Sequence, residues 1–387
     1  MRIALVSDSR DIHTLKLVRY LSAKGHEIHL LSFFDSRDYT SLPGVKLHLL
    51  PKGLLQEGSW IANLARTTLR KVNLGYTAFN PLLAVIRMKA ILNEISPDVL
   101  HGQSIVGHTI LAAATGFHPL VVTSMGSDIL IYTRNSTLAR YAIRYVLSKA
   151  DAVTAHGENL RSEIVRFGVD PGKVFSIISG VDLSDFSPES KDRRIRDSYD
   201  IPDGPIVIST RRMSPVHDVE TLVRAVPLVA KAIPNVTFLL VGDGETRRVL
   251  QDVATKLGVQ DIIRFVGNVP HGELSRYLAS SDIYVSTSIS DGLSVSTMEA
   301  MACGLPLVVT DVGDNHLWIK NEENGYLIPI KNPEALAERV TYLAQNSNVR
   351  ARLGVGNRRL AEEKADLETN MNESFEVYER AIARCGR

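Results

Sequence analysis

Residues 290–306 read SDGLSVSTMEAMACGLP, in which Asp291 and Glu299 lie eight positions apart. The apolar residues 283–285 predict a buried strand, and residues 295–302 predict a helix that the following Gly and Pro end. The turn between them therefore points at a helix N-terminus. Free backbone N–H groups and the positive end of the helix dipole favour an anion there, and we expect a phosphate.

Glu299 lies a little over one turn into this predicted helix. Helical side chains lean toward the N-terminus, so its carboxylate can reach a group held at the start of the helix. A carboxylate accepts two hydroxyl hydrogen bonds, as a ribose diol offers, and Gly292 lets the backbone approach a ligand closely. Taken alone, Asp291 is equally typical of an ordinary turn, and Glu299 of an acid that complements the helix dipole.

The composition is that of a soluble globular protein. The chain has 387 residues, 44% of them hydrophobic and 22% charged, and this length predicts two domains. With 44 basic and 43 acidic residues the net charge is +1, which gives no electrostatic case for a nucleic-acid partner. Cys303 and Cys385 are too few for a disulfide framework or a thiolate metal cage, so we expect a reduced, cytoplasmic protein. No apolar stretch is long enough for a signal peptide or a transmembrane helix, and nothing predicts an oligomeric state.

Short apolar segments alternate with helical patterns along the chain. A first set of strands is predicted at residues 2–7, 27–32, 46–50, 98–101, 119–123, 151–155 and 174–178. A second set is predicted at 205–210, 236–241, 262–266, 283–286, 307–310 and 326–328. Such alternation predicts α/β domains whose parallel sheets are covered by helices. Because the stretch 183–202 is polar, we place one domain at 1–183, a second at 184–365 and a terminal helix at 366–387.

Two polar side chains of the first domain lie near the ends of predicted strands. His13 follows the first strand, at a position where such sheets bind ligands, although a surface or capping histidine is the alternative. Asp128 follows the strand 121–124 and would either hydrogen-bond a sugar or cap the next helix.

Residues 58–72 have the spacing of an amphipathic helix, with Arg66, Arg70 and Lys71 opposite its apolar side. The helix predicted after Asn80 carries two further cations. Basic amphipathic helices are typical of contact with an anionic bilayer, and also of ordinary packing of the apolar side. We therefore keep two hypotheses open: peripheral contact with the inner face of a membrane, or a helix packed within the domain.

Several of these segments together resemble the retaining nucleotide-sugar glycosyltransferases of group 1, also called family 4. The most specific match is 291–306, which is similar to the family's acid-Gly-Phe-Gly…Glu-Ala-Met-Ala-x-Gly-x-Pro segment. Shorter matches in the family's order and spacing occur at 180–188, 212–215, 241–244 and 265–267. The resemblance covers nearly the whole chain.

The resemblance implies a GT-B fold: two facing Rossmann-like domains with an interdomain cleft, and a C-terminal helix that crosses back to the N-terminal domain. The second domain would bind the donor, and the first would bind the acceptor. The implied donor-binding residues are Gly242, Val269, Gly292, Leu293, Ser294, Val295 and Glu299. The implied catalytic residues are Arg212, His217, Asp291 and Asp128. The implied acceptor side contains His13 and Ser127.

Arg212 would stabilise the negative charge that grows on the departing diphosphate, since a guanidinium binds phosphate oxygens bidentately. Three positions depart from the family: Asp291 is usually Glu, His217 is usually Lys, and Met125 is usually His or aromatic. His217 can replace Lys only when it is protonated, so we expect activity to fall as the pH rises through its pKa.

The resemblance implies transfer of a hexose from a nucleotide-sugar donor to an acceptor hydroxyl with retention. The chain contains no Asp-x-Asp pair, so we expect no metal and no cofactor besides the co-substrate. The acceptor would be a saccharide or a lipid-linked molecule, in glycolipid, cell-envelope polysaccharide or glycan biosynthesis. Two alternatives stay open: a GT-B sugar-nucleotide epimerase and a non-catalytic binding protein. A dinucleotide enzyme is disfavoured, because residues 242–247 lack the third small residue of that fingerprint.

Overall fold

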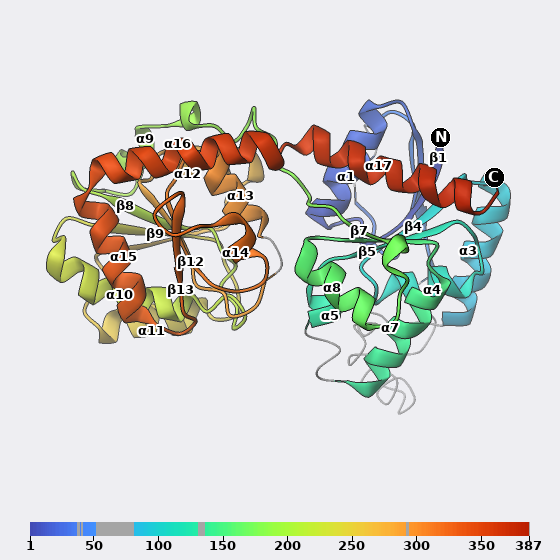
Figure 1. The fold of residues 1–387 in the computed structure, drawn as a ribbon, viewed down its shortest axis with the longest axis horizontal. Coiled ribbons are helices and arrows are strands. Elements are labelled where there is room, and N and C mark those ends of the chain that lie inside the picture. Colours follow the sequence, from blue (N-terminus) through green and yellow to red (C-terminus); the bar gives the residue numbers. More distant parts are fainter. Residues whose placement is uncertain (37–38, 40–41, 52–80, 131–135, 292–293, 387) are drawn as a thin grey trace. The chain divides into compact units, whose positions relative to one another are not determined.

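The computed structural model of the protein describes residues 1–36, 39, 42–51, 81–130, 136–291 and 294–386 (Figure 1). These residues form two compact units. The first comprises Met1–Ile178 together with Met371–Arg387, and the second comprises Ser179–Asn370. Residues 58–72, predicted as a basic amphipathic helix, lie outside the described residues.

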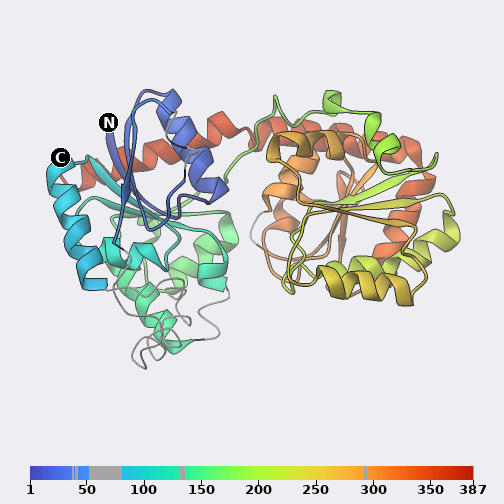
Figure 2. The same cartoon turned by 180° about the vertical axis from the view of Figure 1, so that it is seen from behind.

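The first unit is built on a seven-stranded sheet in the order β3-β2-β1-β4-β5-β6-β7. Its strands are β1 (Arg2–Val6), β2 (Glu27–Ser32), β3 (Val45–Leu49), β4 (Val99–Gln103), β5 (Leu120–Ser124), β6 (Ala152–Ala155) and β7 (Val174–Ser176). Its helices are α1 (Ile12–Ala23), α3 (Pro81–Ile95), α4 (His108–Ala114), α5 (Ser127–Leu130), α7 (Thr137–Lys149) and α8 (Glu158–Arg166). In Figures 1 and 2, α1 lies on one face of this sheet, and α3, α4 and α7 lie on the other.

The second unit is built on a six-stranded sheet in the order β10-β9-β8-β11-β12-β13. Its strands are β8 (Ile206–Ser209), β9 (Thr237–Val241), β10 (Ile263–Gly267), β11 (Ile283–Ser286), β12 (Leu307–Thr310) and β13 (Gly325–Ile328). Its helices are α9 (Arg194–Ser198), α10 (Val219–Ala232), α11 (Arg247–Lys256), α12 (His271–Ala279), α13 (Val295–Ala302), α14 (Asn315–Trp318), α15 (Pro333–Gln345) and α16 (Ser347–Lys364). Every recorded strand pair in both sheets is parallel, so the predicted class of two Rossmann-like α/β domains is confirmed.

The apolar strands are buried on both faces, as parallel strands under two helix layers must be. The residues of β5 and β11 are fully buried, for example. Apolar side chains of the helices complete each core, with Met88 and Ile143 in the first unit and Val223 and Leu336 in the second.

The last helix, α17 (Leu367–Arg384), returns the chain to the first unit. Phe375 stacks on His26 with ring centroids 4.6 Å apart, and the Tyr378 hydroxyl hydrogen-bonds His101 Nδ1 at 2.7 Å. The Arg384 guanidinium donates to the carbonyl of Gly172 at 2.6 Å. Residues near both ends of the chain therefore build one sheet-and-helix unit, in which α17 lies on the same face as α1 (Figure 1).

Within the described ranges, no helix combines the length and the apolar character needed to cross a bilayer.

Candidate active site

The second unit carries a polar cluster where its strand order reverses. β8 and β11 are neighbours in the sheet, and the chain winds away from them in opposite directions, through β9 and β10 and through β12 and β13. The loops that follow β8 and β11 therefore diverge at the carboxyl edge of the sheet, where parallel α/β folds bind their ligands. The first of these loops carries Arg211, and the second carries Asp291 and Ser294.

Arg211 joins the two loops. One of its terminal nitrogens donates to Asp291 Oδ2 at 2.5 Å, and the other donates to Ser296 Oγ at 2.8 Å and to the hydroxyl of Ser294. The Arg211 side chain is 9% exposed and that of Asp291 is 21% exposed. A shielded ion pair of this kind fixes both groups, because removing one leaves the other charge poorly hydrated.

Helix α13 begins at this ion pair. Ser294 caps the helix, and its hydroxyl accepts from the N–H of Thr297. The buried Tyr284 hydroxyl lies among the hydroxyls of Thr210, Ser296 and Thr297 and completes a polar floor. A guanidinium beside the N-terminus of a helix gives two sources of positive potential, an arrangement suited to a phosphate.

The structure brings Arg211, and not Arg212, into this polar cluster, and the catalytic role predicted for Arg212 stays a prediction. Arg212, the predicted catalytic guanidinium, has a side chain that is 70% exposed and lies 3.4 Å from Glu245. The neighbouring Arg211 points the other way, to Asp291 and α13. A shift of the motif by one residue replaces one of these adjacent arginines with the other. The sequence alone therefore does not show which of them belongs to the cluster. The burial of Arg211 against the loop that follows β11 distinguishes it from Arg212.

Burial sets the charge of His217 in this structure. Its Nδ1 lies 2.9 Å from the carbonyl oxygen of Arg212 and 2.9 Å from the hydroxyl of Ser214. Burial, and next the nearby Arg211 guanidinium, lower the pKa of His217 to about 4. The ring is therefore neutral near pH 7 in this structure, and its protonated role beside a diphosphate stays a prediction.

Glu299 is buried inside α13, one helical turn behind the Arg211 ion pair. Its Oε1 lies 3.8 Å from Nε2 of His271, whose ring contacts Phe186 at a centroid distance of 5.3 Å. Burial, and next the Glu299 charge, raise the pKa of Cys303 to about 12, so this thiol is protonated near neutral pH. Ser294 and Val295 stand at the start of the same helix, whereas Gly292 and Leu293 lie outside the described residues.

Gly242 allows two loops to pack closely beside the site. A Cβ atom at Gly242 would lie 2.8 Å from the carbonyl oxygen of Arg211, so only glycine allows the loop after β9 to pass this close. The N–H of Gly242 donates to the carbonyl of Gly267 at 2.8 Å, which leaves it no N–H for a ligand. Gly242 therefore has a packing role, and its predicted contact with the donor stays a prediction. Val269 is half-buried just after β10, and its predicted role stays a prediction.

Asp128 is held by hydrogen bonds within the first unit. It is 1% exposed, and its two oxygens accept hydrogen bonds from five donors. These donors are the N–H groups of Ile105, Met125, Gly126 and Ile129 and the hydroxyl of Ser124. A carboxylate offers about four lone pairs, so none is left for a substrate. Of the two hypotheses, capping of the following turn is the one that the structure favours.

His13 lies at the carboxyl edge of the first unit's sheet, where it was predicted. Its ring centroid is 6.3 Å from that of His156, which follows β6. Burial lowers the pKa of His13, and burial followed by the His13 charge lowers the pKa of His156 to about 4. Both rings are therefore neutral hydrogen-bonding groups near pH 7. Ser127 begins α5 nearby, and its role stays a prediction.

A buried histidine is expected to make the stability of the first unit depend on pH. His101 bonds Tyr378 through Nδ1 and Thr123 Oγ1 through Nε2, each at 2.7 Å, and burial, followed by the His156 charge, lowers its pKa to about 3. Below a pH of about 6.5, His101 is protonated in the unfolded chain, whereas it stays neutral in the folded protein. We expect this group alone to remove on the order of 2 kcal/mol of unfolding free energy between pH 6.5 and 5.

Urea unfolding followed at several pH values measures this loss. His101→Gln should flatten the acid limb, and the exposed His316→Gln should leave it unchanged. Equal acid limbs in the wild type and in His101→Gln would contradict the assignment.

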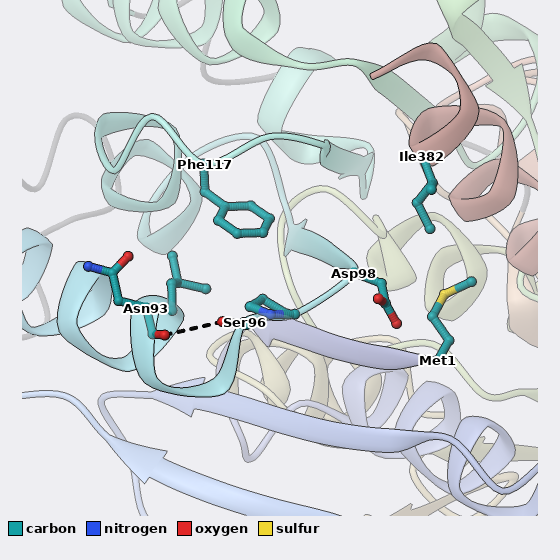
Figure 3. A pocket seen from close by; sticks show the side chains of 8 residues that line it. Met1, Asn93, Ser96, Asp98, Phe117 and Ile382 are labelled. Atoms are coloured by element: carbon teal, nitrogen blue, oxygen red, sulfur yellow. Dashed lines mark hydrogen bonds between the residues drawn. The ribbon is translucent and has the colours of Figure 1, made fainter. Parts of the chain in front are cut away.

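A cavity of about 910 Å³ opens at the opposite end of the first unit's sheet. Figure 3 shows Phe117, Met1, Asp98 and Ile382 around it, at the amino ends of β1 and β4. Ligands of parallel sheets bind at the carboxyl ends, so we assign no part of the active site to this cavity.

Comparison with known proteins agrees with this geometry. Residues 2–157 match the family model "Glycosyl transferase 4-like", and residues 191–359 match "Glycosyl transferases group 1". A GDP-mannose-dependent alpha-(1-6)-phosphatidylinositol monomannoside mannosyltransferase of Mycolicibacterium smegmatis is 27% identical over 65% of this chain and 67% of its own length. A D-inositol 3-phosphate glycosyltransferase of Thermomonospora curvata is 26% identical over 89% of this chain and 84% of its own.

Among solved structures, the Anabaena HepE protein in complex with UDP superposes with a TM-score of 0.79. It shares 19% sequence identity, and the match covers 98% of this chain and 100% of that one. This similarity shows the fold. The two family matches together span most of both units, so the chain is a member of the group 1 glycosyl transferases and has their GT-B fold.

Proposed function

We propose that the protein transfers a hexose from a nucleotide-sugar donor to an acceptor hydroxyl with retention of anomeric configuration. The observation that carries this proposal is the Arg211 network, which joins the loops after β8 and β11 at the start of α13. The names of two similar proteins support a nucleotide donor. One is GDP-mannose-dependent, and the other was solved with UDP.

The donor diphosphate would lie against the N-terminus of α13, within reach of the Arg211 guanidinium. Glu299 would accept hydrogen bonds from the ribose, and the base would lie near Val269. Breaking the anomeric C–O bond places negative charge on the departing diphosphate, so a fixed cation lowers the barrier more than it tightens ground-state binding. Asp291 would hold Arg211 in place through their ion pair.

Two observations support a mechanism without a protein nucleophile. Asp128 has no oxygen free to attack, and the Cys303 thiol is held protonated by burial and by Glu299. The acceptor hydroxyl would then attack from the face that the diphosphate leaves, with a donor phosphate oxygen taking its proton. We further propose that the reaction needs no metal, since the sequence has no Asp-x-Asp pair.

The acceptor would bind to the first unit, at the carboxyl edge that carries His13 and His156. Two neutral imidazoles are suited to sugar hydroxyls, because each ring offers one donor and one acceptor. We propose a saccharide or lipid-linked acceptor. The name of one similar protein contains a phosphatidylinositol monomannoside, and that of another contains D-inositol 3-phosphate. We propose that the enzyme acts in the cytoplasm.

Thermal-shift measurements with UDP-, GDP- and ADP-sugars test the donor site. A donor present at 100 times its dissociation constant should stabilise the second unit by about 2.7 kcal/mol. Turnover assays in EDTA, with and without an acceptor, follow with the donor that gives the shift. No shift with any nucleotide sugar would contradict the proposal, conversion of the donor without an acceptor would indicate an epimerase, and activity that appears only with manganese would contradict metal independence.

A further inference from the structure

The outward side of α7 carries an apolar stripe that no described part of the chain covers. Ala139, Ile143, Val146 and Leu147 face the core. On the opposite side the side chains of Leu138, Tyr141 and Tyr145 are 48%, 65% and 39% exposed. Because they are three and four residues apart, they lie above one another on one face of the helix.

Cations border this stripe. Arg140 and Arg144 are exposed one turn apart on one side of it, and Lys149 is exposed at the end of the helix. The segment 136–149 contains no acid, and no ion pair links either arginine to another residue that the structure describes. Like charges four residues apart destabilise a helix slightly, a cost that an anionic partner would relieve.

Helix α3 also combines exposed apolar side chains with exposed cations. Leu82 and Ile86 are 67% and 54% exposed near its start, and Arg87 and Lys89 are exposed next to them. α4 contacts both α3 and α7, so the three helices form one layer on one face of the sheet. In Figures 1 and 2 the Pro81 end of α3 and the Thr137 end of α7 lie at the same end of this unit.

We infer that this surface, formed by Leu138, Arg140, Tyr141, Arg144 and Tyr145 of α7 and continued by α3, docks the protein on an anionic membrane. Tyrosine has an apolar ring and a polar hydroxyl, which suits it to the boundary between head groups and acyl chains. The arginines would bind acidic head groups, and Leu138 would enter the apolar layer. A nucleic acid would use the cations but would not require an exposed leucine between them.

This surface belongs to the unit that we assign to the acceptor, and it does not include Arg211 or Glu299. Its proposed partner is a lipid bilayer, and binding to it is independent of the donor chemistry proposed above. Docking through α7 and α3 would place the unit that we assign to the acceptor directly on the membrane. A lipid-linked acceptor would then be reached without leaving the bilayer.

Flotation of the full chain with vesicles tests this inference. The wild type should bind vesicles that contain phosphatidylglycerol and should not bind vesicles of phosphatidylcholine alone. Neutralising two cations near such a surface should weaken binding by roughly thirtyfold, so we expect this loss in the variant Arg140→Gln/Arg144→Gln. The matched control, Arg248→Gln/Arg352→Gln, removes the same charge from exposed positions of the second unit and should bind like the wild type.

A second variant, Tyr141→Ser/Tyr145→Ser, separates a membrane from a soluble polyanion, because only the membrane needs the apolar stripe. We expect it to lose binding as well. Full binding by either α7 variant, or no binding of the wild type to anionic vesicles, would overturn the inference. The thermal shift with a nucleotide sugar shows that each variant is folded, and its absence in the wild type would count against the donor site and not against this surface.

Discussion

Replacing Arg211 with Gln is expected to lower kcat by about 10²–10³-fold, the usual effect of removing one preorganised donor from a developing negative charge. The guanidinium is fixed by Asp291 and by two serine hydroxyls, so it needs little rearrangement during the reaction. The effect should fall mainly on kcat, because the contact strengthens as charge develops on the diphosphate.

The chain offers a matched control one residue away. Arg212→Gln makes the same chemical change at a position that is exposed and far less constrained, and we expect its kcat to stay within about threefold of the wild type, as an exposed charge pair contributes little. Steady-state kinetics of both variants decide between the two arginines. A large loss in Arg212→Gln with a normal Arg211→Gln would return the catalytic role to the residue that the motif first indicated.

Replacing Gly354 with Ala is expected to destabilise the second unit by roughly 1–3 kcal/mol or more, the cost of forcing atoms into a packed interior. A Cβ atom at this position of α16 would lie 2.1 Å from the carbonyl oxygen of Gly304. Gly304 ends α13, so α16 packs directly on the helix whose other end carries the proposed phosphate site. The backbone has to move to relieve the clash, and we expect α13 to move with it.

Gly356→Ala is the control in the same helix. Its new Cβ atom would lie 3.5 Å from the carbonyl oxygen of Glu323, an ordinary contact, and alanine favours a helix over glycine by about 1 kcal/mol. This variant should therefore be as stable as the wild type or slightly more stable. Urea unfolding curves measure both changes, and equal midpoints for the two variants would show that α16 can slide away from Gly304 at little cost.

The fold could be predicted because its signals are local and repeated. Each strand is a short apolar run, such as 283–285, and turns with Gly or Asp follow many of them, as at 242–244 and 291–292. Parallel strands buried on both faces need such runs, and one strand followed by one helix leaves few other topologies. The second unit's site loop was identified in the same way, from a strand, a turn and a helix start.

The roles of individual side chains were harder to predict, because they depend on contacts between distant segments. Arg211 and Arg212 are chemically identical, and only the approach of residues 291–296 separates them. Asp128 accepts a hydrogen bond from the N–H group of Ile105, 23 residues earlier in the chain, and no local pattern predicts this contact. His217 was expected to carry a proton, but burial beside Arg211 lowers its pKa to about 4.

The return of α17 to the first unit has a consequence for biosynthesis. Tyr378 and Phe375 reach their partners His101 and His26 only after the whole second unit has left the ribosome. The first unit's sheet, which starts at Arg2, therefore stays incompletely covered while nearly two hundred later residues are translated. We expect chaperones to associate with nascent chains of this protein during that interval.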